Sequence, residues 1–394
     1  MNIAFVGQKG IPAHGGGVEN YVDNIATRLA RRGHDVWAYT RDNYAPAQED
    51  YKGVRTIATP GLHGKNVDAI THSFTAILHA FTLPKLDVIH INSVGPALLT
   101  PIAKLGFFVK GLVTGHQTKV VFTFHSADWH HGKWSPFAKT MLRLGARMGC
   151  VFADEVVTVS KSLRNVALKE FGCEATYIPN GTNIYRVTSD KELAKFGLER
   201  RGYIVFIARL VKHKNAHVLV KAFRHMKKRY GKKLVIVGGS ANTDDYVAYL
   251  KDLVAGDPDI MMLGHQSGRT LKQLFANAAC YVLPSSSEGL SISLLEAGSY
   301  GLPIVISSIR ENREVVEDNG YVARTNSYKD LAAKLEDVFS DYRTALEKAE
   351  ALQDEVKFHY SWKNIVRAFE KVYERDSFEH RGEPVRVTTQ FVYE

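Results

Sequence analysis

Predicted strands alternate with amphipathic helices along this chain of 394 residues, and that alternation limits the fold more than any other feature. In the first half, strands are predicted at NIAFVG, DVWAYT, VRTIA, DVIHIN and VVFTFH, and a helix at 20–32. After EVVTVS and ATYIPNGTN the alternation starts again with GYIVFIARL, KLVIVGG, IMMLGH, CYVLPS and PIVISS. Because alternating strands and helices form parallel sheets covered on both faces, we expect an α/β protein with two doubly wound, Rossmann-like domains.

The boundary between the two domains is predicted in the polar segment 183–200, so the first domain takes residues 1–185 and the second 186–360. Residues 361–377 carry apolar side chains at helical spacing, which predicts a helix that packs back on the first domain. Residues 378–394 are predicted to form a polar tail. Open α/β sheets bind ligands at the carboxyl ends of their strands, so we expect the site in a cleft between the domains.

A formal charge of +10 predicts an acidic partner, which can be nucleic acid, anionic lipid or a phosphorylated small molecule. The sequence contains no nucleic-acid-binding motif and no basic tail, which disfavours nucleic acid. A cytoplasmic protein is expected, because the N-terminus leads directly into a strand and no uninterrupted apolar stretch reaches the roughly 18 residues of a membrane span. Cys150, Cys173 and Cys280 are isolated, so neither a disulfide framework nor a CxxC metal site is indicated.

The segment PSSSEGLSISLLEAGSYGLP, residues 284–303, is typical of a strand, a turn and a helix. Ser291 or Ser293 is the expected N-cap residue of that helix. The backbone N–H groups of Gly289, Leu290 and Ser291 would point out of the helix N-terminus, where the helix dipole adds positive charge. This junction therefore predicts a binding site for a diphosphate.

Two glutamates in the same segment would be repelled by a diphosphate unless each binds hydroxyl groups instead. Glu288 can bind hydroxyls of a sugar, and Glu296, two turns into the helix, can bind both hydroxyls of a ribose. Arg209 and Lys214 follow the first strand of the second domain, where they can neutralise the phosphates. The pattern indicates a sugar nucleotide; the alternative is that these four are ordinary solvated residues.

A glycine-rich stretch, GQKGIPAHGGGVEN, follows the first strand and includes Gly16 and Gly17. Its spacing differs from the G-x-G-x-x-G fingerprint, and the loop is too long for a tight strand-to-helix turn. We expect a flexible loop that can close over phosphates or acceptor. A plain surface loop is the alternative.

In VVFTFHSADWHHGKW, His125 ends a predicted strand and can hydrogen-bond a sugar hydroxyl. Asp128 is expected on the acceptor side, and Trp129 or Trp134 can stack on a sugar face. Asn180 is expected with the following glycine in a turn at the cleft.

A metal site in the same stretch would need its three histidines as ligands: His125, His130 and His131. No carboxylate or cysteine completes the set at helical spacing, so no metal site is predicted.

These features together resemble the family-four retaining glycosyltransferases of the GT-B fold. The resemblance is carried by the glycine loop, the strand ending in His125, IPNG, ARL with Lys214 five residues after the arginine, LGH, and EGLSISLLE, an E-x7-E element. GQKGIPAHGGGVEN and FHSADWHHGKW are similar to bacterial enzymes that build cell-surface polysaccharides. The resemblance implies retaining transfer from a nucleotide-diphosphate sugar, without a metal or other cofactor.

The site residues that the resemblance implies divide by the part of the ligand they would contact. They are Arg209 and Lys214 at the diphosphate, Glu288 and His125 at the donor sugar, Glu296 at the ribose, Gly16 and Gly17 at phosphates or acceptor, and Gly264 and His265 at the nucleobase. The first domain would then serve the acceptor and the second the donor.

No carboxylate is evidently placed as a nucleophile, so we expect substitution on the same face of the sugar, with Arg209 and Lys214 stabilising the leaving group. Two alternatives are a sugar-nucleotide epimerase, which would need no acceptor, and a non-catalytic sugar-nucleotide-binding protein. The latter would have no need to stabilise a leaving diphosphate.

The stretches PIAKLGFFVKGLVTGHQTK and SPFAKTMLRLGARMG are both basic and apolar. Such a composition is consistent with helices that lie on an anionic membrane near a lipid-linked acceptor. Alternatively, their leucines and phenylalanines belong to the core.

Overall fold

The computed structural model describes residues 1–48, 50–62, 64, 67–130, 134–241 and 243–375. It divides into two compact units, one of Met1–Asn180 with the chain from Trp362 onwards, the other of Gly181–Ser361. The chain passes from one unit to the other slightly before the predicted boundary at 185. The predicted tail, 378–394, lies outside the described residues.

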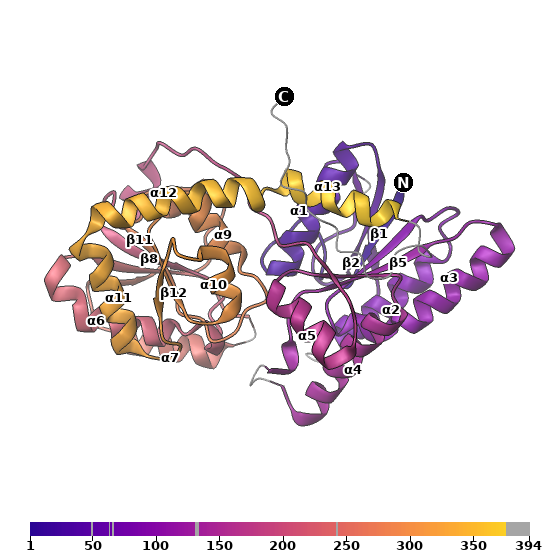
Figure 1. The fold of residues 1–394 in the computed structure, drawn as a ribbon, viewed down its shortest axis with the longest axis horizontal. Coiled ribbons are helices and arrows are strands. Elements are labelled where there is room, and N and C mark those ends of the chain that lie inside the picture. The colour runs from indigo at the N-terminus through magenta and orange to yellow at the C-terminus, as the bar shows by residue number, and fades with distance from the viewer. Residues whose placement is uncertain (49, 63, 65–66, 131–133, 242, 376–394) are drawn as a thin grey trace. The chain divides into compact units, whose positions relative to one another are not determined.

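The first unit contains a seven-stranded parallel sheet with the strand order β3-β2-β1-β4-β5-β6-β7. Figure 1 labels three of its strands, β1, β2 and β5. Its strands are β1 (Asn2–Val6), β2 (Asp35–Arg41), β3 (Val54–Thr59), β4 (Val88–Asn92), β5 (Lys119–Phe124), β6 (Glu155–Thr158) and β7 (Thr176–Tyr177). Its helices are α1 (Gly17–Arg31), α2 (Asp68–Ala80), α3 (Thr100–Thr114), α4 (Pro136–Phe152), α5 (Lys161–Phe171) and α13 (Trp362–Glu374), with short 3-10 helices η1 (Pro96–Leu99) and η2 (Asp128–His130). In this strand order β1 is a central strand, paired with both β2 and β4.

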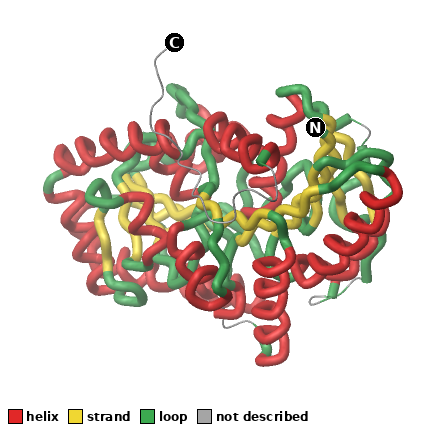
Figure 2. Tube along the Cα trace, turned by 45° about the vertical axis from the view of Figure 1, so that its right-hand side comes forward, coloured by secondary structure: helices red, strands yellow, loops and turns green. Residues whose placement is uncertain are grey.

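The second unit contains a six-stranded parallel sheet with the order β10-β9-β8-β11-β12-β13. Its strands are β8 (Tyr203–Ile207), β9 (Lys233–Val237), β10 (Ile260–Met262), β11 (Cys280–Leu283), β12 (Ile304–Ser307) and β13 (Tyr321–Ala323). Its helices are α6 (Ala216–Tyr230), α7 (Asp244–Val254), α8 (Gly268–Ala276), α9 (Ile292–Ser299), α10 (Arg310–Val316), α11 (Tyr328–Ser340) and α12 (Tyr342–His359), with η3 (Lys191–Phe196) and η4 (Lys212–Lys214). In each unit the strands lie inside and the helices outside (Figure 2). The predicted pair of doubly wound α/β domains is confirmed, although the short edge strand β13 was not predicted.

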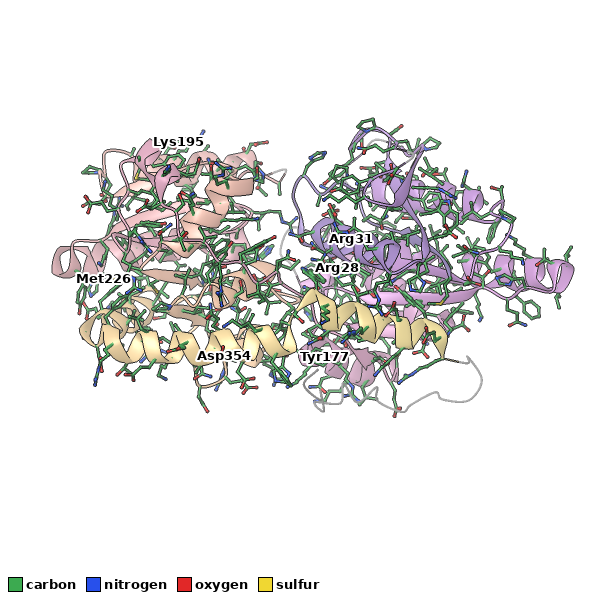
Figure 3. The ribbon with its side chains drawn as sticks, turned by 90° about the horizontal axis from the view of Figure 1, so that it is seen from above. Arg28, Arg31, Tyr177, Lys195, Met226 and Asp354 are labelled. Carbon is green, nitrogen blue, oxygen red and sulfur yellow. The ribbon has the colours of Figure 1, made fainter. Side chains whose placement is uncertain are left out.

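Helix α13 returns to the first unit and packs against α1. The apolar positions that predicted this helix are the ones it buries: Trp362, Ile365, Val366, Phe369, Val372 and Tyr373. At its start, the guanidinium of Arg28, a residue labelled in Figure 3, lies 5.9 Å from the ring centre of Trp362. Farther along, Arg32 Nε donates a hydrogen bond of 2.6 Å to Glu370 Oε1. Residues more than 300 positions apart therefore form one core.

Candidate active site

In the second unit, two loops at the carboxyl edge of the sheet are joined by hydrogen bonds. One follows β8 and the other follows β11. Ser286 N donates to the carbonyl of His213 at 2.8 Å, and the buried Asn215 donates its amide to the carbonyl of Pro284 at 2.9 Å. Asn215 has a φ of 56°, a conformation that asparagine tolerates better than most residues. These bonds fix the two loops as one surface.

A close ion pair crosses from one of these loops to the other. Lys214 Nζ lies 2.6 and 2.7 Å from the two carboxylate oxygens of Glu288. The side chains are only 12% and 7% exposed, so each charge depends on the other for compensation. The sequence had assigned Lys214 to a diphosphate and Glu288 to a sugar, and it had not predicted that the two are paired. A signal for this pairing is hard to find in the sequence, because 74 residues separate the partners.

Helix α9 begins directly after this pair. Ser291 occupies the N-cap position, as predicted, although its side chain accepts no hydrogen bond from the helix. Its hydroxyl lies 3.1 Å from that of Ser293, which also accepts a hydrogen bond of 2.8 Å from Tyr281. Gly289 precedes this turn, and the buried side chain of Leu290 anchors it. The hydroxyl of Ser291 therefore bonds with that of Ser293 and not with the first turn of the helix.

Glu296 lies on α9 one turn after its first residue, Ile292, and not two turns into the helix as expected, and its side chain is half-buried. Desolvation raises the pKa of Glu296 to about 7. Among the described residues, none donates a hydrogen bond to its carboxylate. The alternative of a fully solvated glutamate is therefore wrong, since the side chain is half-buried and its carboxylate is desolvated. Such a group is suited to a ligand that donates hydrogen bonds.

The remaining predicted donor residues lie at the same edge of the sheet. Arg209 follows β8 and is exposed, while the next backbone N–H, that of Leu210, donates to Gly239 O after β9 at 2.9 Å. Gly264 follows β10 with a φ of 65°. The exposed His265 comes next, and its Cβ lies 3.9 Å from where a Cβ on Gly239 would be. The ends of β8, β9, β10 and β11 thus bring these groups to one face.

In the first unit, the glycine-rich loop between β1 and α1 is hydrogen-bonded to that helix. Lys9 N donates to Glu19 Oε1 at 3.1 Å, and Ala13 N donates to Asp23 Oδ2 at 2.9 Å. Both carboxylates come from α1, one turn apart. That the loop can close over a ligand stays a prediction, and sequence reasoning had overlooked the two acidic residues at i and i+4.

Gly16 and Gly17 stand where this loop enters α1. Gly16 is the N-cap residue, with a φ of 106° that favours glycine, and Gly17 is the first residue of the helix. A Cβ at Gly17 would meet no atom within 4 Å. The helix therefore begins three residues before its predicted start at Asn20.

His125 follows β5, as predicted, and lies against two residues from neighbouring elements. Its Nε2 is 3.0 Å from Asn92 Oδ1, and its ring meets that of Tyr21 edge to face at 4.5 Å. Burial lowers the pKa of His125 to about 3, so its imidazole is neutral at physiological pH. Asn92 was not predicted, although a polar residue that ends the buried strand DVIHIN was visible in the sequence.

Two of the acceptor-side predictions are wrong in detail. Trp129 is buried, with its ring 5.8 Å from that of Phe124 in a stacked arrangement and 5.9 Å from that of Phe171, so it belongs to the core and cannot stack on a sugar. Asn180 is buried in irregular chain after β7, not in a turn. Asp128 is half-buried and accepts a hydrogen bond from the hydroxyl of Ser126.

Two of the three histidines that had been weighed as metal ligands, His125 and His130, lie among the described residues. Within the described ranges, no three His, Cys, Asp or Glu residues are grouped as a metal site. His131 lies outside the described residues.

Two doubly wound α/β units, with basic, acidic and helix-terminal groups gathered at the strand ends of the second, define a protein of the GT-B class. Structures of this class match nearly the whole chain. Anabaena Alr3699/HepE in complex with UDP-glucose aligns with a TM-score of 0.75 at 19% identity, over 94% of this chain and 99% of that one. Sucrose-phosphate synthase from Thermosynechococcus elongatus aligns with a TM-score of 0.76 at 21% identity, over 94% and 98%.

The family follows from the sequence matches. The model of glycosyltransferase family 4 matches residues 15–186, and that of glycosyl transferases group 1 matches residues 188–358. An uncharacterised glycosyltransferase of Methanocaldococcus jannaschii is 26% identical over 95% of this chain and 98% of its own. The O-antigen chain mannosyltransferase B of Escherichia coli is 29% identical over 54% of this chain and 53% of its own. The chain belongs to the family-four glycosyltransferases, and the epimerase and binding-protein alternatives are set aside.

Proposed function

We propose that this protein transfers a sugar from a nucleotide-diphosphate sugar to a glycan or lipid-linked acceptor, with retention of anomeric configuration, in the synthesis of a cell-surface polysaccharide. The single observation that carries the proposal is the buried Lys214–Glu288 pair beside the start of α9, which also holds Glu296. Similarity to an O-antigen mannosyltransferase and to a fold-mate crystallised with UDP-glucose supports it.

Donor binding would rearrange the charges of this site. A diphosphate brings oxygens that compete with Glu288 for Lys214, and the exposed Arg209 adds a second cation. The N–H groups at the start of α9 favour the same anion. Once Lys214 is shared with phosphate, the Glu288 carboxylate is available to sugar hydroxyls. We expect Arg209 and Lys214 to stabilise the leaving group in place of a metal, so chelation with EDTA should leave transfer unchanged.

Retention requires a defined course for the atoms. The bond between the anomeric carbon and the diphosphate oxygen breaks, and the acceptor oxygen bonds to the same face of that carbon. The acceptor proton passes to the departing diphosphate, whose charge Arg209 and Lys214 stabilise. A covalent glycosyl-enzyme intermediate, trapped and identified by mass spectrometry, would overturn this course.

Thermal denaturation with UDP, GDP, ADP and dTDP sugars tests the donor site, because a ligand of the native state raises the melting temperature. At a ligand concentration about 100 times the Kd, the free energy of unfolding increases by about 2.7 kcal/mol. We expect one nucleotide to stabilise the wild type, while Glu296→Ala and Lys214→Ala lose the shift despite an intact fold. Lys212→Ala, at an exposed neighbour, is the control and should keep the shift. If every variant keeps it, the donor binds elsewhere.

Contact with an anionic membrane is proposed from α3. Helix α3 packs one side through Ala103 and Phe107, yet its opposite side is also apolar. The exposed apolar side chains of this helix, which we call the α3 stripe, are Ile102, Leu105, Phe108, Val109, Leu112 and Val113. The alternative that these residues belong to the core is therefore wrong.

Charge and length both bear on how α3 would meet a membrane. Helices α3 and α4 carry five basic residues and no acidic one, which favours an anionic surface. By length and composition, Pro96–Thr114 is the one helix in the described part of the chain that could cross a membrane, although it contains two lysines. Because its other side packs in the first unit, we propose that it lies on the membrane. The protein would then act at the inner face of the cell membrane.

Sedimentation with vesicles tests the α3 stripe. We expect the wild type to bind phosphatidylglycerol vesicles more than phosphatidylcholine vesicles, less so in high salt, and the double variant Leu105→Ser, Leu112→Ser to lose binding. Leu168→Ser removes a similarly exposed leucine from α5 and should bind as the wild type does. If the stripe variant instead abolishes a dimer seen by light scattering and vesicles never bind, the stripe contacts a second copy.

A further inference from the structure

Asn92 stands at the end of β4 with its whole side chain buried. Its amide nitrogen lies 3.3 Å from the carbonyl oxygen of Val6 and 3.4 Å from that of His90. Its amide oxygen lies 3.0 Å from His125 Nε2. The two ends of this amide therefore have different partners, which determine its orientation.

The orientation of the amide in turn determines where the imidazole carries its proton. If the amide were turned over, its oxygen would face two carbonyl oxygens and no donor. In the observed orientation Asn92 Oδ1 can only accept, so His125 Nε2 must donate. Because the imidazole of His125 is neutral, its proton stays on Nε2 and Nδ1 keeps a lone pair. Among the described residues, none hydrogen-bonds to Nδ1, and the side chain is only half-buried.

The backbone around Asn92 is shaped to hold it in place. Ser93, the next residue, has a φ of 74°, which is uncommon for a residue other than glycine. Gly7, at the end of β1, has a φ of 101°, and a Cβ there would come within 2.2 Å of the carbonyl oxygen of Asn92. Unfavourable backbone conformations of this kind concentrate at functional sites.

We propose that Asn92 is a positioning residue for transfer: its amide oxygen holds the proton of His125 on Nε2, so that Nδ1 accepts a hydrogen bond from a hydroxyl of the donor sugar. The inference rests on the proposed function and adds a requirement to it. The hydroxyl at His125 must donate, so a donor in which fluorine or hydrogen replaces it should be a poor substrate. A fluorine of similar size cannot supply the proton that Nδ1 needs.

The tautomer is measured without substrate, by nitrogen-15 NMR of the histidine rings, with His125→Gln to assign the signal. We expect the wild type to carry its proton on Nε2, and Asn92→Leu to give a mixture of tautomers. Asn277→Leu is the matched control. Asn277 is also a buried asparagine that donates to two carbonyls, Ser189 O and Gln273 O, but it lies in the other unit and should leave His125 unchanged.

Kinetics then separate positioning from a purely structural role. Asn92→Leu should lower kcat about 10- to 100-fold with a smaller change in KM, as expected for a misplaced reacting group. Asn92→Asp keeps an acceptor for Nε2 and should restore part of the loss, while Asn277→Leu should leave kcat near the wild-type value.

A wild-type proton on Nδ1 would overturn the inference whether or not the donor is a nucleotide sugar. The expected tautomer with a wild-type kcat in Asn92→Leu would overturn the role in transfer alone. Failure of every nucleotide sugar to bind, with the tautomer as expected, would instead count against the proposed function.

Discussion

At the scale of single residues, the ionised carboxylate of Glu296 destabilises the folded state, because it is desolvated. Its carboxylate is desolvated on α9, and its pKa of about 7 lies above the ordinary value of 4.5. A raised pKa means that the folded state binds the proton more tightly than the unfolded state. Stability from this group is therefore present below about pH 4.5 and is lost as the pH rises through 7.

Replacing Glu296 by glutamine should separate stability from function. Glutamine cannot ionise, so Glu296→Gln should melt at a higher temperature than the wild type at pH 8 and at a similar temperature near pH 4.5. The same variant should lose the stabilisation by nucleotide sugar, because a ribose would meet an amide in place of a carboxylate. Melting curves at the two pH values decide the matter: an equal difference at both would contradict the raised pKa.

The Lys214–Glu288 pair gives a second prediction. Lys214→Met leaves a buried carboxylate without its partner, which should cost about 3–5 kcal/mol of unfolding free energy. The double variant Lys214→Met, Glu288→Gln removes both charges and should recover most of that loss. Urea denaturation of the single and double variants measures the coupling. Additive losses would mean that the pair does not form in solution.

At the scale of elements, α13 belongs to the core of the first unit. Phe369 is fully buried there, and its ring centre lies 6.0 Å from that of Tyr21 on α1. Phe369→Ala should cost about 3–5 kcal/mol by chemical denaturation. Lys371→Ala, on the exposed side of the same helix, should cost little. A loss below about 1 kcal/mol for Phe369→Ala would mean that α13 does not pack as described.

Some features of the helices, strands and loops could be predicted from the sequence, and others could not. Apolar periodicity located the strands that bear the site and the buried face of α13, because burial repeats with the geometry of the element. It could not assign Trp129, since a tryptophan that follows a strand can pack in the core or contact a ligand with the same surrounding sequence. It also could not reveal that Glu19 and Asp23 anchor the glycine loop, because those bonds depend on the three-dimensional path of the loop.

At the scale of the whole molecule, the order of motifs predicted the family. The donor-side residues that it named lie at one sheet edge, since strand ends there bring distant segments together, and their roles stay predictions. The pairing of Lys214 with Glu288 and the contact of Asn92 with His125 could not be predicted, because each joins residues from separate strands at hydrogen-bond distance. The exposure of the α3 stripe likewise depends on which side of α3 its neighbours cover.

The central claim is retaining transfer at the site around Lys214, Glu288 and Glu296. The most direct measurement is proton NMR of the glycoside formed from the stabilising nucleotide sugar and a panel of soluble and lipid-linked glycans. The account predicts a product with the anomeric configuration of the donor, absent with Lys214→Ala and with Glu296→Ala. An inverted product, or an undiminished yield from both variants, would contradict it.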